Sequence, residues 1–184
     1  MVRDYTRVGA AGEVFNEFLN EFQRETDRAA AVLAAAFLDD QLGRLLKASL
    51  VSDHEYVEAL FHRNGPAASF SSRISLAYAI GLIGLDEAKD LHRVRDIRNA
   101  FAHQLHGLSF DVDSIAQKCD HFSIVELFFA TSDSRREWVT TPRGRFNLAT
   151  SLLAFRLRSL LREPQRLALR SPLRPPVDEF HYDP

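Results

Sequence analysis

The amino-acid sequence predicts an all-α protein, a single-domain helical bundle. Three observations lead to this prediction. Apolar residues recur at helical spacing along most of the chain, first at Phe15, Phe18, Leu19 and Phe22. Capping or turn residues separate these segments, as in the Asn-Gly-Pro turn at 64–66. The 184 residues, of which 46% are hydrophobic, suffice to form one core of ordinary size.

The expected helices, in chain order, cover residues 12–50 with a break near 24–27, then 54–61, 69–83, 87–105, 113–119, 121–131 and 146–161. The expected N-caps are Thr26 or Asp27, Ser52 or Asp53, Asp86 and Asp113. Residues 121–131 fit either a strand or a buried helix, and we interpret them as helical because their neighbours are helical. A polar loop is expected over 133–145.

These elements predict three parts of the chain: a flexible N-terminus over residues 1–11, the bundle over 12–163, and a Pro/Arg-rich tail over 164–184. We expect the core of the bundle to include Phe18, Leu42, Ile74, Leu91, Ile97 and Leu157. A substantial β-sheet would contradict the predicted fold.

Several classes of protein do not fit the composition. Cys119 is the only cysteine, so an intrachain disulfide is impossible, which is in keeping with a cytoplasmic location. No apolar run approaches the ~18 residues of a membrane span. The seven histidines do not form a convincing set of metal ligands, and no Gly-rich phosphate loop is present. We therefore expect no membrane span, no metal and no cofactor.

Charge is unevenly distributed along the chain. The segment from Arg135 to Arg174 contains ten Arg and two Glu, a balance of +8, so that the remainder carries 13 basic and 23 acidic residues, or −10. Such a segment meets either an anionic partner or the acidic body of its own fold. Pro164 and Pro172 interrupt its arginine spacing, and no DNA-reading motif accompanies it. We therefore expect weak, salt-sensitive nucleic-acid contact at most, and no sequence-specific DNA binding.

The expected helix over 87–105 contains the most informative polar residues. Helical geometry places Arg95, Asn99 and His103 four residues apart on one face, with Arg98 about 100° to one side of Asn99. An imidazole beside a guanidinium and an amide can transfer protons while holding a phosphate group. Alternatively, these side chains only connect helices, with Arg98 paired to an acid such as Asp39 or Asp40.

A short motif in this helix resembles one known family. The residues from Arg98 to His103 match the Arg-x4-His motif of HEPN domains, which are helical bundles, commonly dimeric, and in many cases metal-independent ribonucleases. The resemblance implies that Arg98 binds phosphate and that His103 acts in acid–base chemistry, near its counterpart across the dimer. The motif spans only six residues.

A longer stretch resembles a different family. Residues 64–103 contain the pattern G-P-x4-S-x-R-I-x-L-x-Y-x2-G-L-I, followed by a short acidic turn and a long helix. This arrangement resembles the mannitol operon repressor (MtlR/MltR) family, and residues 27–46 occupy the position of that family's long first helix. The resemblance covers roughly residues 15–105 and implies a transcriptional regulator.

Two residues of this pattern, Arg73 and Tyr78, are candidates for structural or partner-binding roles. Asp39 and Asp40 are adjacent on the first long helix and ~100° apart, so only one of them can face inward. We expect the inward carboxylate to pair with Arg73 or Arg98. The Tyr78 ring is expected to pack, with its hydroxyl reaching a polar partner.

The leading interpretation is a non-enzymatic regulator that acts through protein contacts, as a homodimer and with a further protein partner. The alternative is a HEPN-type metal-independent ribonuclease or toxin that uses Arg98, Asn99 and His103. Burial of Arg98 and His103 with satisfied partners would favour the regulator, and their exposure opposite their dimer mates across a cleft would favour the nuclease. We expect a structural His103.

Overall fold

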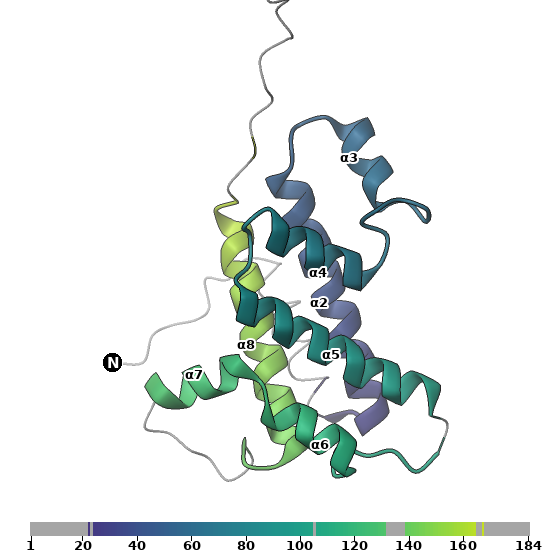
Figure 1. The fold of residues 1–184 in the computed structure, drawn as a ribbon, viewed down its shortest axis with the longest axis vertical. Helices are drawn as coiled ribbons and strands as arrows, with labels where there is room; N and C mark the ends of the chain where they lie inside the picture. The colour runs from purple at the N-terminus through teal and green to yellow at the C-terminus, as the bar shows by residue number, and fades with distance from the viewer. Residues whose placement is uncertain (1–21, 23, 105, 132–138, 165–166, 168–184) are drawn as a thin grey trace, which may run out of the picture.

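The computed structural model describes residues 22, 24–104, 106–131, 139–164 and 167. These residues form α-helices and no β-strand (Figure 1), which confirms the all-α prediction. The helices are α2 (Asp27–Ser49), α3 (His54–Phe61), α4 (Phe70–Ala79), α5 (Leu85–His103), α6 (Asp113–Asp120), α7 (Ser123–Thr131) and α8 (Pro142–Arg162).

Helix α2 is the centre of the bundle and packs against α8, α5 and α4. Helices α6 and α7 pack on α8, while α3 lies at the end of the molecule where α2 finishes (Figure 1). Small residues on α2, among them Ala30, Ala31, Ala34 and Ala35, are almost fully buried. Their short side chains let the neighbouring helices approach α2 closely, so the three helices α2, α4 and α5 meet at one place.

The predicted core is confirmed where the structure describes it. Leu42, Ile74, Leu91, Ile97 and Leu157 are all buried in one cluster, at whose centre tilted rings of Phe101, Phe110 and Phe146 stack in series. Phe18, the expected terminus 1–11 and most of the expected tail 164–184 lie outside the described residues.

Two of the predicted caps are confirmed. Thr26 accepts a hydrogen bond from the Ala29 N–H at the start of α2, and Asp53 accepts one from the Tyr56 N–H at the start of α3. Residues 123–131 are helical, as expected. A buried carboxylate of α5, Asp90, accepts hydrogen bonds from the first N–H groups of this helix, at Ser123 (3.1 Å) and Ile124 (2.9 Å).

Other predicted boundaries are wrong. Helix α5 begins at Leu85 rather than after Asp86, because the carboxylate of Glu87 reaches back to the Gly84 N–H at 2.7 Å and replaces an Asp cap. Val112, rather than Asp113, is the N-cap of α6. Gly81, with a φ of 77°, ends α4 before the expected residue 83.

The final helix also begins earlier than expected. Thr141 caps it by accepting from the Gly144 N–H, and Pro142 fills the first turn, where a missing N–H has no cost. Residues 142–145 are therefore helical and not part of the predicted polar loop.

Arginines of the basic segment meet acidic groups of the same chain. Arg143 pairs with Asp27 at 3.0 Å, Arg156 pairs with Glu87 at 2.7 Å, and Arg145 pairs with Glu126. Charge compensation within the molecule, one of the two readings of the uneven charge, therefore applies to these three arginines. Arg135, Arg136, Arg166, Arg170 and Arg174 lie outside the described residues. No helix in the described ranges has the length and apolar character needed to cross a membrane.

Candidate functional site

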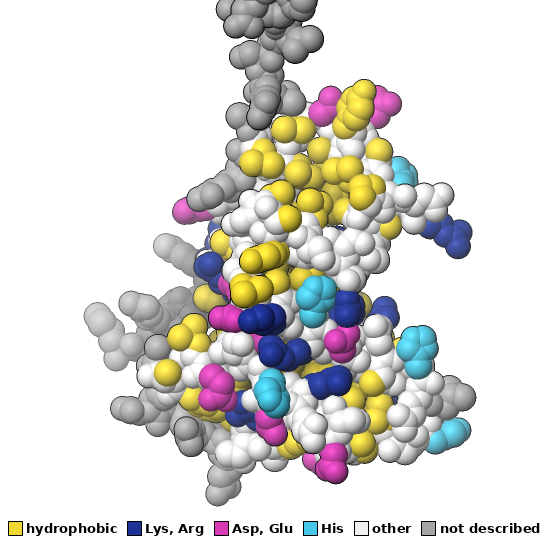
Figure 2. Space-filling model, in the orientation of Figure 1, with side chains coloured by type: hydrophobic (Ala, Val, Ile, Leu, Met, Phe, Trp, Pro, Cys, Tyr) yellow, Lys and Arg dark blue, Asp and Glu magenta, His cyan; other side chains and the backbone are white. Residues whose placement is uncertain are grey.

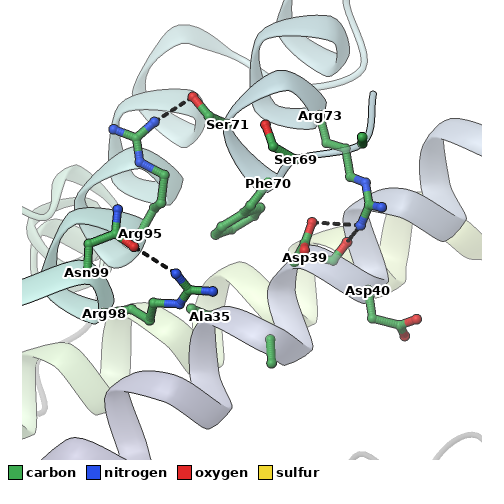
Figure 3. A pocket seen from close by; sticks show the side chains of 12 residues that line it. Ala35, Asp39, Asp40, Ser69, Phe70, Ser71, Arg73, Arg95, Arg98 and Asn99 are labelled. Atoms are coloured by element: carbon green, nitrogen blue, oxygen red, sulfur yellow. Dashed lines mark hydrogen bonds and ion pairs between the residues drawn. The ribbon is translucent and has the colours of Figure 1, made fainter. Parts of the chain in front are cut away.

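An open cleft of about 680 Å³ lies where α2, α4 and α5 meet (Figure 3). Its lining contains three arginines, two aspartates and several small polar groups: Ala35, Ala36, Asp39, Asp40, Ala68, Ser69, Phe70, Ser71, Arg73, Arg95, Arg98 and Asn99. Of the seven predicted candidate residues, five line this cleft: Asp39, Asp40, Arg73, Arg98 and Asn99.

The wall formed by α2 and α4 is held by the pair of Arg73 and Asp39. The guanidinium Nη1 of Arg73 lies 2.8 Å from Asp39 Oδ1, and its Nε donates to the Ala67 carbonyl at 3.0 Å. Gly43 makes this approach feasible, because a Cβ there would lie 3.3 Å from Arg73 Nη1. The predicted pairing of an inward aspartate with Arg73 is therefore present, and Asp39 is the inward residue.

Asp40 points away from this pair. Its carboxylate binds Arg44 one turn later at 2.8 Å, and both side chains are more than half exposed. An exposed i, i+4 pair of this kind contributes little to stability. The two adjacent aspartates thus have different environments, as the ~100° rotation between successive helix residues requires.

The α5 wall carries Arg95, Arg98 and Asn99. Arg95 donates to Ser71 Oγ across the cleft and to Asp96 on its own helix, so it connects α5 to α4. Arg98 donates to Asn99 Oδ1 at 2.8 Å (Figure 3). Within the described part of the chain Arg98 forms no ion pair, and its side chain is exposed.

Burial raises the pKa of Asp39 above its ordinary value of 3.8, against the opposing effect of the Arg73 guanidinium. The charge of Arg98 also acts on Asp39 and lowers its pKa, which places Arg98 within electrostatic range of the opposite wall. Arg98 therefore contributes a positive charge to the cleft that Arg73 and Arg95, each bound to a carboxylate, do not.

His103 and Tyr78 are not part of the cleft. His103 is the last residue of α5 and is exposed, so the expectation of a buried structural histidine is wrong. The helix carries it around and beyond the cleft, and only Arg95 and Asn99 of the predicted face remain there. Tyr78 is 46% exposed. Its hydroxyl makes no hydrogen bond within the described residues, so the expected polar partner is not found there.

Sequence reasoning missed the contribution of the α4 N-terminus. Ser69, the N-cap, accepts from the Ser72 N–H at 3.1 Å, and Phe70 and Ser71 follow it along the cleft edge. The Ser-x-x-Ser spacing was a signal for this cap. Nothing in the sequence indicated that Ser71 would bind Arg95, because 24 residues separate them.

The groups of this cleft can bind a polar or anionic ligand. Guanidinium, hydroxyl and amide groups converge in the cleft, but the imidazole that the ribonuclease alternative requires lies outside it. In the residues that the structure describes, no three His, Cys, Asp or Glu side chains are grouped so as to hold a metal ion. Cys119 is fully buried, and burial raises its pKa to about 12, so it is no nucleophile.

Comparison with known proteins identifies the family of the chain. The family model described as "Mannitol repressor" matches residues 15–142, well over half of the sequence. The chain belongs to the mannitol repressor family. The resemblance seen in residues 64–103 is thereby confirmed, whereas nothing supports the HEPN-like motif.

A solved structure shows the same fold. The chain is similar to one in the X-ray structure of the MtlR–HPr complex from Escherichia coli, with a TM-score of 0.63 and 20% sequence identity. The similarity covers 79% of this chain and 98% of that one. A comparison with curated protein sequences gave no match. Membership of the mannitol repressor family supports the predicted regulator, and the ribonuclease alternative has no support.

Proposed function

We propose that this protein is a regulator that acts by binding another protein, and that a protein of the HPr type is its first candidate partner. The observation that carries the proposal is the family match over residues 15–142, together with a fold shared with a chain solved in complex with HPr. Arg98 lines the cleft and His103 does not, which supports binding rather than Arg–His catalysis in this cleft. In keeping with this role, we propose a cytoplasmic location and a homodimer.

The surface near the α4–α5 connection is the candidate contact region. Figure 2 shows hydrophobic side chains gathered over α3 and α4, beside a band of Lys, Arg and His over α5. Two large side chains flank the connection, Tyr78 at 46% exposure and Leu85 at 50%. Tyrosine is enriched in protein interfaces because its ring contributes apolar area and its hydroxyl contributes a hydrogen bond. We therefore propose that Tyr78 contacts the partner.

Calorimetric titration of the full chain with HPr, from Escherichia coli and from the organism of this chain, tests the proposal. Wild type should bind at least one of them. Tyr78→Ala should weaken binding about tenfold or more, as for a central interface aromatic. Phe155→Ala is the matched control, because Phe155 is also exposed (62%) but lies on α8. If neither HPr protein binds, HPr is not the partner. If Tyr78→Ala and Phe155→Ala lose equal affinity, the surface around Tyr78 is not the contact region.

Weak nucleic-acid contact through the C-terminal arginines remains a separate proposal. It should disappear as salt is raised, because such binding depends on the release of counterions from phosphates. Tight binding to one DNA sequence that survives high salt would contradict a regulator that acts through protein contacts.

A further inference from the structure

The cleft between α2, α4 and α5 contains an arginine, Arg98, that forms no ion pair within the described residues. Arg73 is neutralised by Asp39, and Arg95 is neutralised by Asp96 while it holds Ser71. Arg98 donates only to an amide oxygen, that of Asn99, within the described residues. Figure 3 shows its guanidinium extending into the cleft between the α5 wall and Asp39. An exposed arginine with this setting is available for an anion.

The edge of the cleft opposite α5 favours a phosphate group as that anion. The first residues of α4 line it, and the N-terminal end of a helix carries partial positive charge. Ser69 accepts from the N–H groups of Ser72 and Arg73, so those of Phe70 and Ser71 are the ones without a hydrogen bond among the described residues. The Ser69 hydroxyl lies at the same edge. A phosphate group has three terminal oxygens, so it can accept hydrogen bonds from the guanidinium of Arg98 and from the start of α4 at the same time. A carboxylate has only two oxygens for the same donors.

The remaining lining suits hydroxyl groups. Asp39 uses Oδ1 for Arg73, and its Oδ2 has no hydrogen bond within the described part of the chain. The Asn99 amide nitrogen and the Asp40 carboxylate add a donor and an acceptor. The volume of about 680 Å³ falls within the usual range for small-molecule sites. Phe70 is the one aromatic residue of the lining, so an aromatic ligand could stack on one of its faces only.

We propose that this cleft binds a phosphate monoester of a small polyol or sugar, with the phosphate held by Arg98 and the α4 N-terminus. The carboxylates of the α2 wall accept hydrogen bonds from the hydroxyls of the ligand. This ligand site is separate from the proposed protein contact at Tyr78, and its occupancy does not depend on the identity of the protein partner.

Calorimetry on the full chain with four probes tests the proposal. Mannitol 1-phosphate and glucose 6-phosphate carry both chemical features, inorganic phosphate carries only the anion, and mannitol carries only the hydroxyls. At least one of the two esters should bind more tightly than inorganic phosphate and mannitol. Failure of both esters to bind at millimolar concentration overturns the proposal. So does binding of inorganic phosphate as tight as that of the esters, because the hydroxyl contacts would then contribute nothing.

Two variants locate the site. Arg98→Ala should weaken the binding of the ester about tenfold or more, the usual effect of losing a hydrogen bond to a charged group. Because the Arg98 side chain is exposed, we expect this variant to fold, and a melting curve verifies it. Arg63→Ala removes the same charge from an exposed position outside the lining and should leave binding unchanged. Equal affinities for wild type and a folded Arg98→Ala variant would show that the cleft is not the site.

Discussion

Replacing Asp39 by Ala should destabilise the fold by an amount that its surroundings allow us to estimate. The substitution leaves Arg73 without its carboxylate, although the Ala67 carbonyl remains bound to Nε. The side chains of Arg73 and Asp39 are 18% and 31% exposed, so the pair is partly buried. The remaining guanidinium would therefore lose a charge-assisted bond but regain some contact with water.

The size of the effect lies between two limits. Breaking a fully buried ion pair costs roughly 3–5 kcal/mol, and losing a hydrogen bond to a charged group costs about 1.5–3 kcal/mol. Partial exposure of both side chains favours the lower range. We expect a loss of about 2 kcal/mol, which for a protein of this size corresponds to a decrease in Tm of roughly 4–8 °C.

Urea and thermal unfolding, followed by circular dichroism, measure this loss. Asp40→Ala is the matched control on the neighbouring residue, because its carboxylate belongs to an exposed pair with Arg44. The control should change the free energy of unfolding by no more than about 0.5 kcal/mol. If the two variants lose equal stability, the Asp39–Arg73 pair does not stabilise the contact between α2 and α4.

The remaining predictions concern three other residues. His103→Ala should leave Tm nearly unchanged, since His103 is exposed, and there should be no RNA cleavage to lose; metal-independent cleavage by wild type that vanishes in the folded variant would contradict the regulator. Cys119 should not react with a thiol reagent until the chain unfolds, because burial raises its pKa to about 12; rapid reaction of the native protein would show an open thiol. Burial, followed by the charge of Arg95, lowers the pKa of His92 below 6.5. The unfolded chain then binds more protons, so stability should fall as pH decreases through about 6.5. Urea unfolding at high and low pH should show that His92→Gln loses less stability at low pH than wild type. Equal losses of stability in the two proteins would refute this reasoning.

Local residue preferences were enough to predict much of the helical structure. Thr26 and Asp53 cap their helices by bonds within the next three residues, so neighbouring sequence determines them. The boundary at Leu85 was missed because we expected Asp86 as the cap in place of Gly84. The boundary at Pro142 was missed because we expected the proline in a polar loop, although the first turn of a helix tolerates it. The helical state of 123–131 is different, since its first N–H groups bind Asp90 from more than 30 residues away.

The candidate site shows the same division. Rotation along one helix predicted that only one of Asp39 and Asp40 would face inward and that it would pair with Arg73 or Arg98. The structure shows that the inward residue is Asp39 and that its partner is Arg73. The burial of His103 was predicted wrongly. A helical face defined by four-residue steps drifts by about 40° at each step, and whether its last residue meets a neighbour depends on where that neighbour ends.

The sequence by itself determined the helical class, the family, the core positions and that only one of Asp39 and Asp40 faces inward, because these depend on spacing along one helix or on a pattern of adjacent residues. Only the tertiary structure decided which polar groups share a cleft. Among the residues that the structure describes, Arg98 has no carboxylate partner while Arg73 and Arg95 are paired, since the packing of α4 and α5 on α2 brings Asp39 to one arginine and Ser71 to another. Contacts between residues far apart in the chain depend on how the helices pack, and spacing along the sequence does not specify that packing.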